Sequence, residues 1–244
     1  MPGHYCDMSV AATRQKQTSE WYEDYYTSKG DDRNDPLRNP GVLFQNLAFE
    51  KSIVEALRAI RLDKTWKILD VGCGAGFSML RLLSYGLEPE RLHGIDISED
   101  RIARGRRRQP ALNFSLGDAT AMEYAADSFD LAMESTMFVQ ITDEHMAEGI
   151  AREMVRVVKP GGYIMLTDWR YSFGRKGYSA VSRERIARLF GVGARTEVVC
   201  YRRGALLPPL GRALSRYLPS LYFPVCRVLP FLVGQVTVVL RKGV

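Results

Sequence analysis

The sequence predicts an α/β fold in which helices flank a mostly parallel sheet. Short apolar runs bounded by turn residues alternate along the chain with longer segments of helical period, the order that βαβ units produce. The first of these runs leads into a glycine-rich loop and then a helix, the unit that places ligands at the carboxyl end of a parallel strand. With 244 residues, 46% of them hydrophobic, the chain can bury the core of one such domain. We assign this domain to residues 42–244 and a tail with an aromatic segment to residues 1–41.

Composition limits the partners and the compartment. The formal net charge of +6 favours anionic neighbours such as phosphorylated substrates, nucleic acid or an acidic membrane surface, although an ordinary basic protein has the same charge. The four cysteines lack paired spacing and histidine neighbours, so we expect no zinc site, no disulfide framework and a reducing cytoplasm. We also expect no signal peptide, and no run reaches the roughly 18 apolar residues that span a bilayer.

The amino-terminal part divides into three stretches. Residues 1–18 are polar without a period, and we expect a frayed tail. Ser19 is a candidate cap for a short helix that brings four aromatic side chains together, Trp21, Tyr22, Tyr25 and Tyr26. Residues 44–60 have a strong helical period, and this predicts a helix that packs on the sheet. Its expected apolar face holds Leu47, Ile53, Val54 and Leu57.

Residues 67–78 organise the rest of the chain. An apolar run at 68–71 predicts a buried strand, and three glycines then alternate with small residues, at Gly72, Gly74 and Gly76. A helix follows to about Tyr85, with Phe77, Leu80 and Leu83 on one face. The glycine spacing differs from the G-x-G-x-x-G loop that binds pyrophosphate, and Asp70 would repel a pyrophosphate but attract an ammonium or sulfonium group.

This loop resembles the first motif of the class I S-adenosylmethionine-dependent methyltransferases, and three later stretches resemble further motifs of that family in order. Asp96 follows Gly76 by about 20 residues, at the end of a strand predicted over 91–98, the distance at which a carboxylate meets a ribose diol. Gly117-Asp118-Ala119 follows a strand predicted over 112–116. A Phe-Asp pair opens a strand over 127–135, and Lys-Pro-Gly-Gly at 159–162 precedes a fifth strand that ends at Trp169.

The resemblance implies a Rossmann-like sheet of seven strands, the class I methyltransferase fold, and S-adenosylmethionine as the cofactor. It implies that Asp96 binds the ribose hydroxyls, that Ile97 lies against the adenine face and that Asp118 and Ala119 bind the adenine edge. Glu134 is expected beside the sulfonium. The implied cofactor-binding residues are Asp70, Gly72, Gly74, Gly76, Asp96, Ile97, Asp118, Ala119 and Glu134. The aromatic segment near the amino terminus is expected either to close over the cofactor as a lid or only to fasten that segment to the core.

The last third varies more. We expect a helix over 182–190, a strand over 195–202 and a final strand over 234–241, the antiparallel one. Residues 206–233 form an insertion before that strand, predicted to cover the acceptor site or to rest on a membrane surface. Five prolines interrupt its period, so we expect a local cap over the core in place of an amphipathic helix.

Methyl transfer from a sulfonium is an in-line displacement that depends mainly on alignment and on exclusion of water. A hydroxyl acceptor also needs a base. Asp168 is the first candidate, because it ends a buried strand where desolvation would raise its pKa, although it would equally pair with Arg170 and shape the pocket. His145 has the more suitable unperturbed pKa but lies in the first turn of a helix, and Glu134 is the third candidate. No acid-rich cluster of the kind that hard cations need is present in the sequence, so no metal is expected.

The acceptor is less determined. The family's nucleic-acid amino methyltransferases carry an Asn/Asp-Pro-Pro-Tyr/Phe motif where this sequence has Glu134-Ser-Thr-Met137, and no cysteine suited to RNA C5 methylation lies near this edge. The chain looks more like the small-molecule enzymes, including those that methylate sugar hydroxyls of glycolipid or polysaccharide intermediates. We therefore expect an O-methyltransferase with a small-molecule acceptor, no nucleic acid, and at most peripheral contact with the inner face of a membrane. An N- or C-methyltransferase on another metabolite or on RNA, a non-catalytic cofactor-binding protein and a homodimer stay open.

Overall fold

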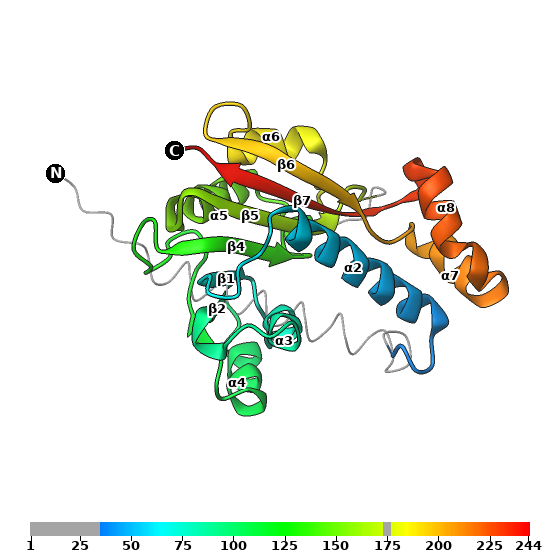
Figure 1. Ribbon diagram of the computed structural model, residues 1–244, viewed down its shortest axis with the longest axis horizontal. Coiled ribbons are helices and arrows are strands. Elements are labelled where there is room, and N and C mark those ends of the chain that lie inside the picture. Colours follow the sequence, from blue (N-terminus) through cyan, green and yellow to red (C-terminus); the bar gives the residue numbers. More distant parts are fainter. Residues whose placement is uncertain (1–34, 173–176) are drawn as a thin grey trace.

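The computed structural model describes residues 35–172 and 177–244 (Figure 1). In this part of the chain, strands β1 to β7 form one sheet in the order β3-β2-β1-β4-β5-β7-β6, with β7 antiparallel to both of its neighbours. The strands are β1 (Ile68–Val71), β2 (Leu92–Asp96), β3 (Asn113–Leu116), β4 (Phe129–Ser135), β5 (Val158–Trp169), β6 (Thr196–Arg203) and β7 (Gln235–Lys242). The predicted seven-stranded sheet with its antiparallel last strand is confirmed. The predicted tail and aromatic helix lie outside the described residues.

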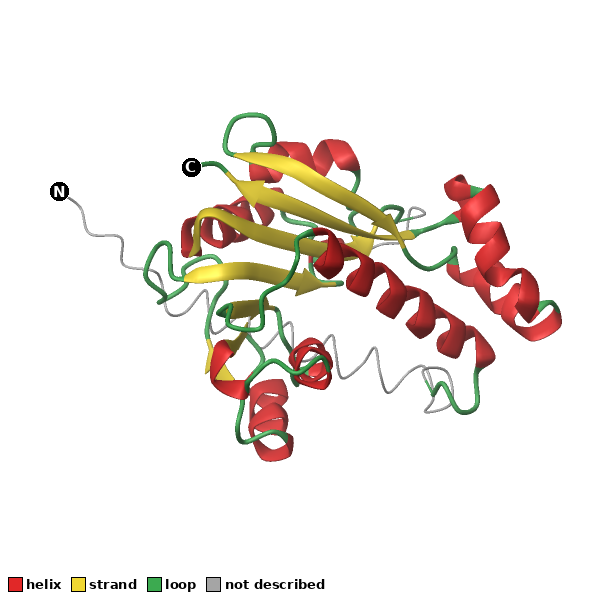
Figure 2. Cartoon of the chain, viewed as in Figure 1, coloured by secondary structure: helices red, strands yellow, loops and turns green. Residues whose placement is uncertain are grey.

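Helices cover both faces of the sheet and extend beyond one end of it (Figures 1 and 2). The α-helices are α2 (Pro40–Ala59), α3 (Phe77–Ser84), α4 (Glu99–Arg108), α5 (Glu144–Val157), α6 (Arg183–Phe190), α7 (Pro208–Tyr217) and α8 (Tyr222–Val228). Short 3-10 turns are η2 (Pro89–Arg91), η3 (Phe138–Gln140), η4 (Pro219–Leu221) and η5 (Pro230–Leu232). One core cluster joins the sheet to α5 and α6, and a second joins its other face to α2, α3 and α4. None of the described helices is long and apolar enough to cross a bilayer.

Local chemistry explains where α2 begins. The Asn39 side chain accepts a hydrogen bond from the backbone N–H of Gly41 at 3.0 Å, and Pro40 occupies the first helical position. The helix therefore begins before Phe44, its predicted start. It buries Ile53 and Leu57 as predicted, whereas Leu47 is 47% exposed and the prediction for that side chain was wrong.

The apolar stripe of Phe77, Leu80 and Leu83 is not the buried face of α3. Met79 and Leu82 are buried, whereas Phe77 is 69% exposed. Gly76 precedes the helix with a φ of +86°, and this left-handed turn sets the direction in which the helix leaves the loop. The Met79 side chain then packs against the backbone of Gly94 in β2, where an added Cβ would lie 2.7 Å from Met79 Cε.

Residues 206–233 form the helices α7 and α8, so the expectation that prolines prevent a helix there was wrong. The prolines do not break these helices, since each lies where proline is tolerated. Pro208 and Pro209 begin α7, Pro219 and Pro230 begin 3-10 turns, and Pro224 lies in the first turn of α8. The N–H groups of a first turn have no intrahelical acceptor, so proline removes no helical hydrogen bond there.

Candidate functional site

A cavity of about 650 Å³ lies at the carboxyl ends of β1, β2 and β4. Its walls are the glycine loop after β1, the ends of β2 and β3, the segment after β4 and the first half of α5. Of the predicted cofactor residues, six line it: Gly72, Gly74, Asp96, Ile97, Asp118 and Ala119. The structure thus brings together residues from three strand ends. Asp70, Gly76 and Glu134 are not among the lining residues.

The loop after β1 requires glycine for two reasons. Gly72, Gly74 and Gly76 have φ values of +71°, +54° and +86°, in the left-handed region that other residues rarely adopt. A Cβ on Gly72 would lie 2.7 Å from the Met137 sulfur, so a side chain there would collide with the opposite wall of the cavity. The bare backbone of this loop therefore allows close approach of a ligand.

Asp96 joins the loop to the end of β2. One carboxylate oxygen accepts the backbone N–H of Gly74 and the other accepts that of Ser98, each at 2.8 Å. Because each carboxylate oxygen has two lone pairs, both can accept a further hydrogen bond. A group that faces the cavity in this way suits a pair of neighbouring hydroxyls.

Asp70 lies behind the loop and is 2% exposed. Its Oδ2 is buried without a hydrogen-bond partner. Burial, and then the nearby charge of Asp96, raise the pKa of Asp70 to about 8. A buried carboxylate of this kind is costly to ionise unless a cation or a donor comes close.

Glu134 and Asp168 end β4 and β5 and are both buried. Glu134 accepts the backbone N–H groups of Met137 at 2.9 Å and Thr167 at 3.0 Å. Asp168 accepts those of Val139 at 2.9 Å and Trp169 at 2.7 Å. Burial raises the pKa of both carboxyls, and Asp168 raises that of Glu134 further. These acids hold the 137–139 segment, which carries one wall of the cavity.

Arg170, the predicted partner of Asp168, binds two backbone carbonyl oxygens in the structure. The Arg170 guanidinium donates to the carbonyl oxygens of Val233 at 2.7 Å and Pro230 at 2.6 Å. It thereby fastens the end of β5 to the insertion. Neither Asp168 nor His145 lines the cavity, and His145 is exposed. Their role as bases stays a prediction.

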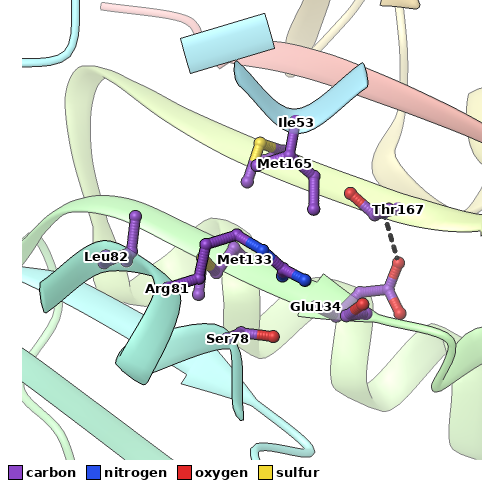
Figure 3. Close-up of a pocket in the computed structure, with 9 residues that line it drawn as sticks. Ile53, Ser78, Arg81, Leu82, Met133, Glu134, Met165 and Thr167 are labelled. Atoms are coloured by element: carbon purple, nitrogen blue, oxygen red, sulfur yellow. Dashed lines mark hydrogen bonds between the residues drawn. The ribbon is translucent and has the colours of Figure 1, made fainter. Parts of the chain in front are cut away.

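A second, much smaller pocket of about 10 Å³ lies on the α2 and α3 side of the sheet (Figure 3). That volume holds about one water molecule. Figure 3 shows the Arg81 side chain reaching from α3 toward Glu134, which receives the Thr167 hydrogen bond drawn there. Ser135, the residue directly after Glu134, lines both pockets, whereas Glu134 lines only the small one.

Several lining residues were not predicted as site residues, namely Phe77, Arg101, Gln140, Met146 and Ile150, whereas Ser135 was expected at this edge beside Glu134. Arg101 and Phe77 lie in helices that follow the motif strands, where the helical period alone suggests a core or a solvent role. The one available signal is position, because residues just after β4 necessarily meet the ligand edge.

The residues fit the adenosyl sulfonium that the sequence predicts. Asp96 and Asp118 supply acceptors, Ile95 and Ile97 supply apolar contact, and the glycine loop leaves its backbone accessible. A volume of 650 Å³ falls within the range of about 300–1,000 Å³ that is usual for small-molecule sites.

Comparisons with known proteins agree with this geometry. The methyltransferase domain family matches residues 68–162. A demethylmenaquinone methyltransferase of Renibacterium salmoninarum is 30% identical over 131 residues, which are 53% of this chain and 52% of the relative. A 2-methyl-6-phytyl-1,4-hydroquinone methyltransferase of Synechocystis sp. is 35% identical over 107 residues, 42% of this chain and 31% of the relative. The chain therefore spans about half or less of the length of these curated relatives.

Among solved structures, an S-adenosylmethionine-dependent methyltransferase of Methanosarcina mazei has the same fold. The TM-score is 0.58 with 20% sequence identity, and the alignment covers 79% of this chain and 97% of the other. Identity at this level speaks for the fold alone.

Proposed function

Because this chain belongs to the class I S-adenosylmethionine-dependent methyltransferases, by its domain at residues 68–162 and by its fold, we propose that it transfers a methyl group to a small-molecule acceptor. The cofactor, S-adenosylmethionine, supplies an electrophilic methyl group when it is bound. One observation carries the proposal: the cavity of about 650 Å³ at the strand ends, which joins the glycine loop and Asp96 to the segment after β4.

We propose the following division of work among the cofactor-binding residues. Asp96 accepts the ribose hydroxyls, Ile97 packs on the adenine face, and Asp118 with the Ala119 N–H binds the adenine edge. The loop of Gly72, Gly74 and Gly76 brings its backbone close to the methionine part. Asp70 lies behind this loop, where its carboxylate favours a cation through the electrostatic field without contact.

The base is proposed from position. Glu134 is the strongest of the three predicted candidates, since it neighbours Ser135, which lines both pockets. Both oxygens of Asp168 already accept backbone N–H groups, as both oxygens of Glu134 do, so these bonds do not separate the two carboxyls. Asp168 ranks lower because neither of its neighbours in sequence lines the large cavity. His145 is exposed in the first turn of α5 and is not itself a lining residue, although its neighbour Met146 is.

We propose an amphiphilic acceptor with a polar head on a long apolar chain. The side of the cavity beyond the glycine loop is lined by Met137, Ile141, Met146 and Ile150 beside Ser135 and Gln140. This mixture suits a small polar head whose apolar remainder leaves the cavity. The hydroxyl of a sugar carried by a glycolipid or polysaccharide intermediate is the first candidate. The ring of a prenylated hydroquinone is the second, and the names of the two relatives favour it.

Labelled cofactor tests this proposal. The purified protein is incubated with S-adenosylmethionine carrying a heavy methyl group and with lipid and aqueous extracts, and the products are identified by mass spectrometry. We expect the label in an organic-soluble product with a hydroxyl or hydroquinone head, and much less label with Gly72→Ala at a cofactor concentration near the wild-type Kd. Label found in RNA, or only in water-soluble metabolites, contradicts the proposed acceptor, and absence of any product contradicts the proposed activity.

A further inference from the structure

The insertion that carries α7 and α8 has apolar side chains that the described part of the chain leaves exposed. Its inner side has a core of its own, in which Tyr222 is 1% exposed, packs on the Phe44 ring at 5.2 Å and accepts the Leu206 N–H at 3.3 Å. Seven large apolar side chains of the same segment are nevertheless more than a third exposed. These are Tyr217, Leu218, Leu221, Phe223, Val228, Leu229 and Phe231. We call these side chains, together with Arg212, Arg216 and Arg227, the outer surface. So many exposed apolar side chains in one short segment mark an interaction site.

The charge of the segment has one sign. Residues 198–244 contain no aspartate or glutamate, and the insertion contributes Arg212, Arg216 and Arg227, all exposed. Among the residues that the structure describes, none of these three arginines has an acidic partner. A basic and apolar surface without internal charge compensation suits a partner that offers both negative charge and hydrocarbon.

The outer surface also adjoins the ligand edge of the sheet. Figure 1 shows α7 and α8 together beyond the carboxyl ends of β4 and β5. Arg170, two residues after Asp168, donates to the carbonyl oxygens of Pro230 and Val233, and the Tyr171 hydroxyl donates to that of Phe231 at 3.3 Å. Phe231 itself is 62% exposed. The exposed apolar side chains therefore lie next to the carboxyl end of β5, at the edge of the sheet where the acceptor is expected.

We propose that the outer surface docks this protein on the surface of an anionic lipid bilayer. The apolar side chains of α7, α8 and η5 enter the boundary between head groups and acyl chains, while the three arginines meet the lipid phosphates. Docking in this pose brings the carboxyl edge of the sheet close to the bilayer, and an acceptor with a lipid chain then reaches the cavity without leaving the membrane. The delivery of such an acceptor rests on the function proposed above, whereas docking itself does not.

Vesicle sedimentation tests the docking. Full-length protein is mixed with vesicles of phosphatidylcholine alone, or with an equal share of phosphatidylglycerol, and the bound fraction is measured without cofactor or acceptor. We expect binding to the anionic vesicles, weakened by added salt. The double variant Val228→Ser/Phe231→Ser and the triple variant Arg212→Glu/Arg216→Glu/Arg227→Glu are each expected to lower the partition coefficient by about tenfold or more.

The control replaces residues of matched chemistry elsewhere. The control variant is Val198→Ser combined with Arg107→Glu/Arg108→Glu. It changes an apolar side chain that is 51% exposed and two exposed arginines, all outside the insertion. We expect it to bind vesicles like the wild type. Circular dichroism and calorimetric binding of S-adenosylhomocysteine show that each variant is folded and keeps its cofactor site.

Equal binding of all variants, or no binding by the wild type, overturns the proposal. So does a dimer, seen by light scattering, that Val228→Ser/Phe231→Ser splits while vesicles bind nothing. Loss of methyl transfer with intact vesicle binding counts against the proposed function only.

Discussion

At the glycine loop, one added side-chain atom is enough to disturb the cavity. Gly72 combines a φ of +71° with an added-Cβ distance of 2.7 Å to the Met137 sulfur. Gly72→Ala therefore incurs backbone strain of about 1–2 kcal/mol and also narrows the cavity. We expect its affinity for S-adenosylhomocysteine, measured by calorimetry, to fall by about tenfold or more.

Gly193 is the matched control for that substitution. It has a φ of +91°, so Gly193→Ala carries similar backbone strain, but nothing lies within 4 Å of the added Cβ. This glycine lies between α6 and β6, away from the cavity. We expect Gly193→Ala to lower the melting temperature without changing affinity. Equal affinities for the two variants would mean that the loop does not approach the ligand.

Asp70 gives the protein a pH dependence that one substitution removes. Burial and the charge of Asp96 raise the pKa of Asp70 from 3.8 to about 8. The native state therefore holds this proton to a higher pH than the unfolded chain, so the contribution of Asp70 to stability is complete below 3.8 and is lost as the pH rises through about 8. Relative to Asp70→Asn, the free energy of unfolding of the ligand-free wild type should fall by about 1 kcal/mol per pH unit in this window.

Urea denaturation of both proteins at several pH values measures this difference. Because a bound cation favours the ionised carboxylate, wild-type affinity for S-adenosylmethionine is also expected to rise with pH over the same range, and that of Asp70→Asn to stay flat. Parallel stability curves for the two proteins would show that Asp70 is ionised throughout.

At the scale of elements, the segment after β4 is held from two sides. Asp168 accepts the Val139 N–H, and Arg185 of α6, 5% exposed, donates to the carbonyl oxygens of Phe138 at 3.0 Å and Ile141 at 2.8 Å. Arg185 also pairs with Glu144 at 3.0 Å. One guanidinium thereby joins α6, η3 and the start of α5 into a single wall of the cavity.

Arg185→Lys tests this wall. Lysine keeps the charge but cannot reproduce the planar fork, so at least one buried carbonyl loses its donor, at a cost of about 1–3 kcal/mol in the free energy of unfolding. We expect weaker S-adenosylhomocysteine binding as well. Arg188→Lys is the control, because Arg188 also contacts Glu144 but its side chain is 56% exposed, and a change within about 0.5 kcal/mol is expected. Similar losses in both variants would assign the effect to Glu144 and not to the carbonyls.

Asp168→Asn separates a base from a positioning residue. An amide has one acceptor oxygen, so either the Val139 or the Trp169 N–H loses its partner, and this should cost about 1–3 kcal/mol of stability. If Asp168 positions the segment after β4, stability, cofactor affinity and turnover should fall together. Turnover that falls a hundredfold or more, on the order of a general-base contribution, with stability and affinity intact would identify Asp168 as the base.

The helices of the insertion show where sequence reasoning fails for elements. Pro208, Pro219 and Pro230 interrupt the period of residues 206–233, and the period alone therefore predicts irregular structure. Position within a helix decides the effect of proline, and that position depends on where the chain turns, which depends in turn on tertiary packing around Tyr222. The apolar stripe of α3 differs from its buried face for a similar reason, since the Gly76 turn sets the rotation of that helix.

At the scale of the molecule, the sheet was the most predictable feature. Each parallel strand is a short buried run followed by a turn and a helix, and the glycine loop, Asp96 and Asp118 mark three successive strand ends that the topology must bring to one edge. The sequence does not reveal which polar groups at that edge are already hydrogen-bonded to other groups of the protein. Asp168 illustrates this, because its hydrogen bonds to Val139 and Trp169 depend on a loop path that no local pattern encodes.

Cofactor binding should be visible in the stability of the whole molecule. A ligand that binds only the native state at a hundredfold excess over its Kd adds about 2.7 kcal/mol, which for a domain of this size raises Tm by roughly 5–10 °C. We expect this rise with S-adenosylhomocysteine and none with a nicotinamide dinucleotide, because the loop lacks the G-x-G-x-x-G spacing that binds a pyrophosphate. Asp96→Ala should remove most of the rise, since Asp96 both binds the Gly74 N–H and faces the cavity. Differential scanning fluorimetry decides the matter: a rise with the dinucleotide and none with S-adenosylhomocysteine would mean that the strand ends hold a different ligand.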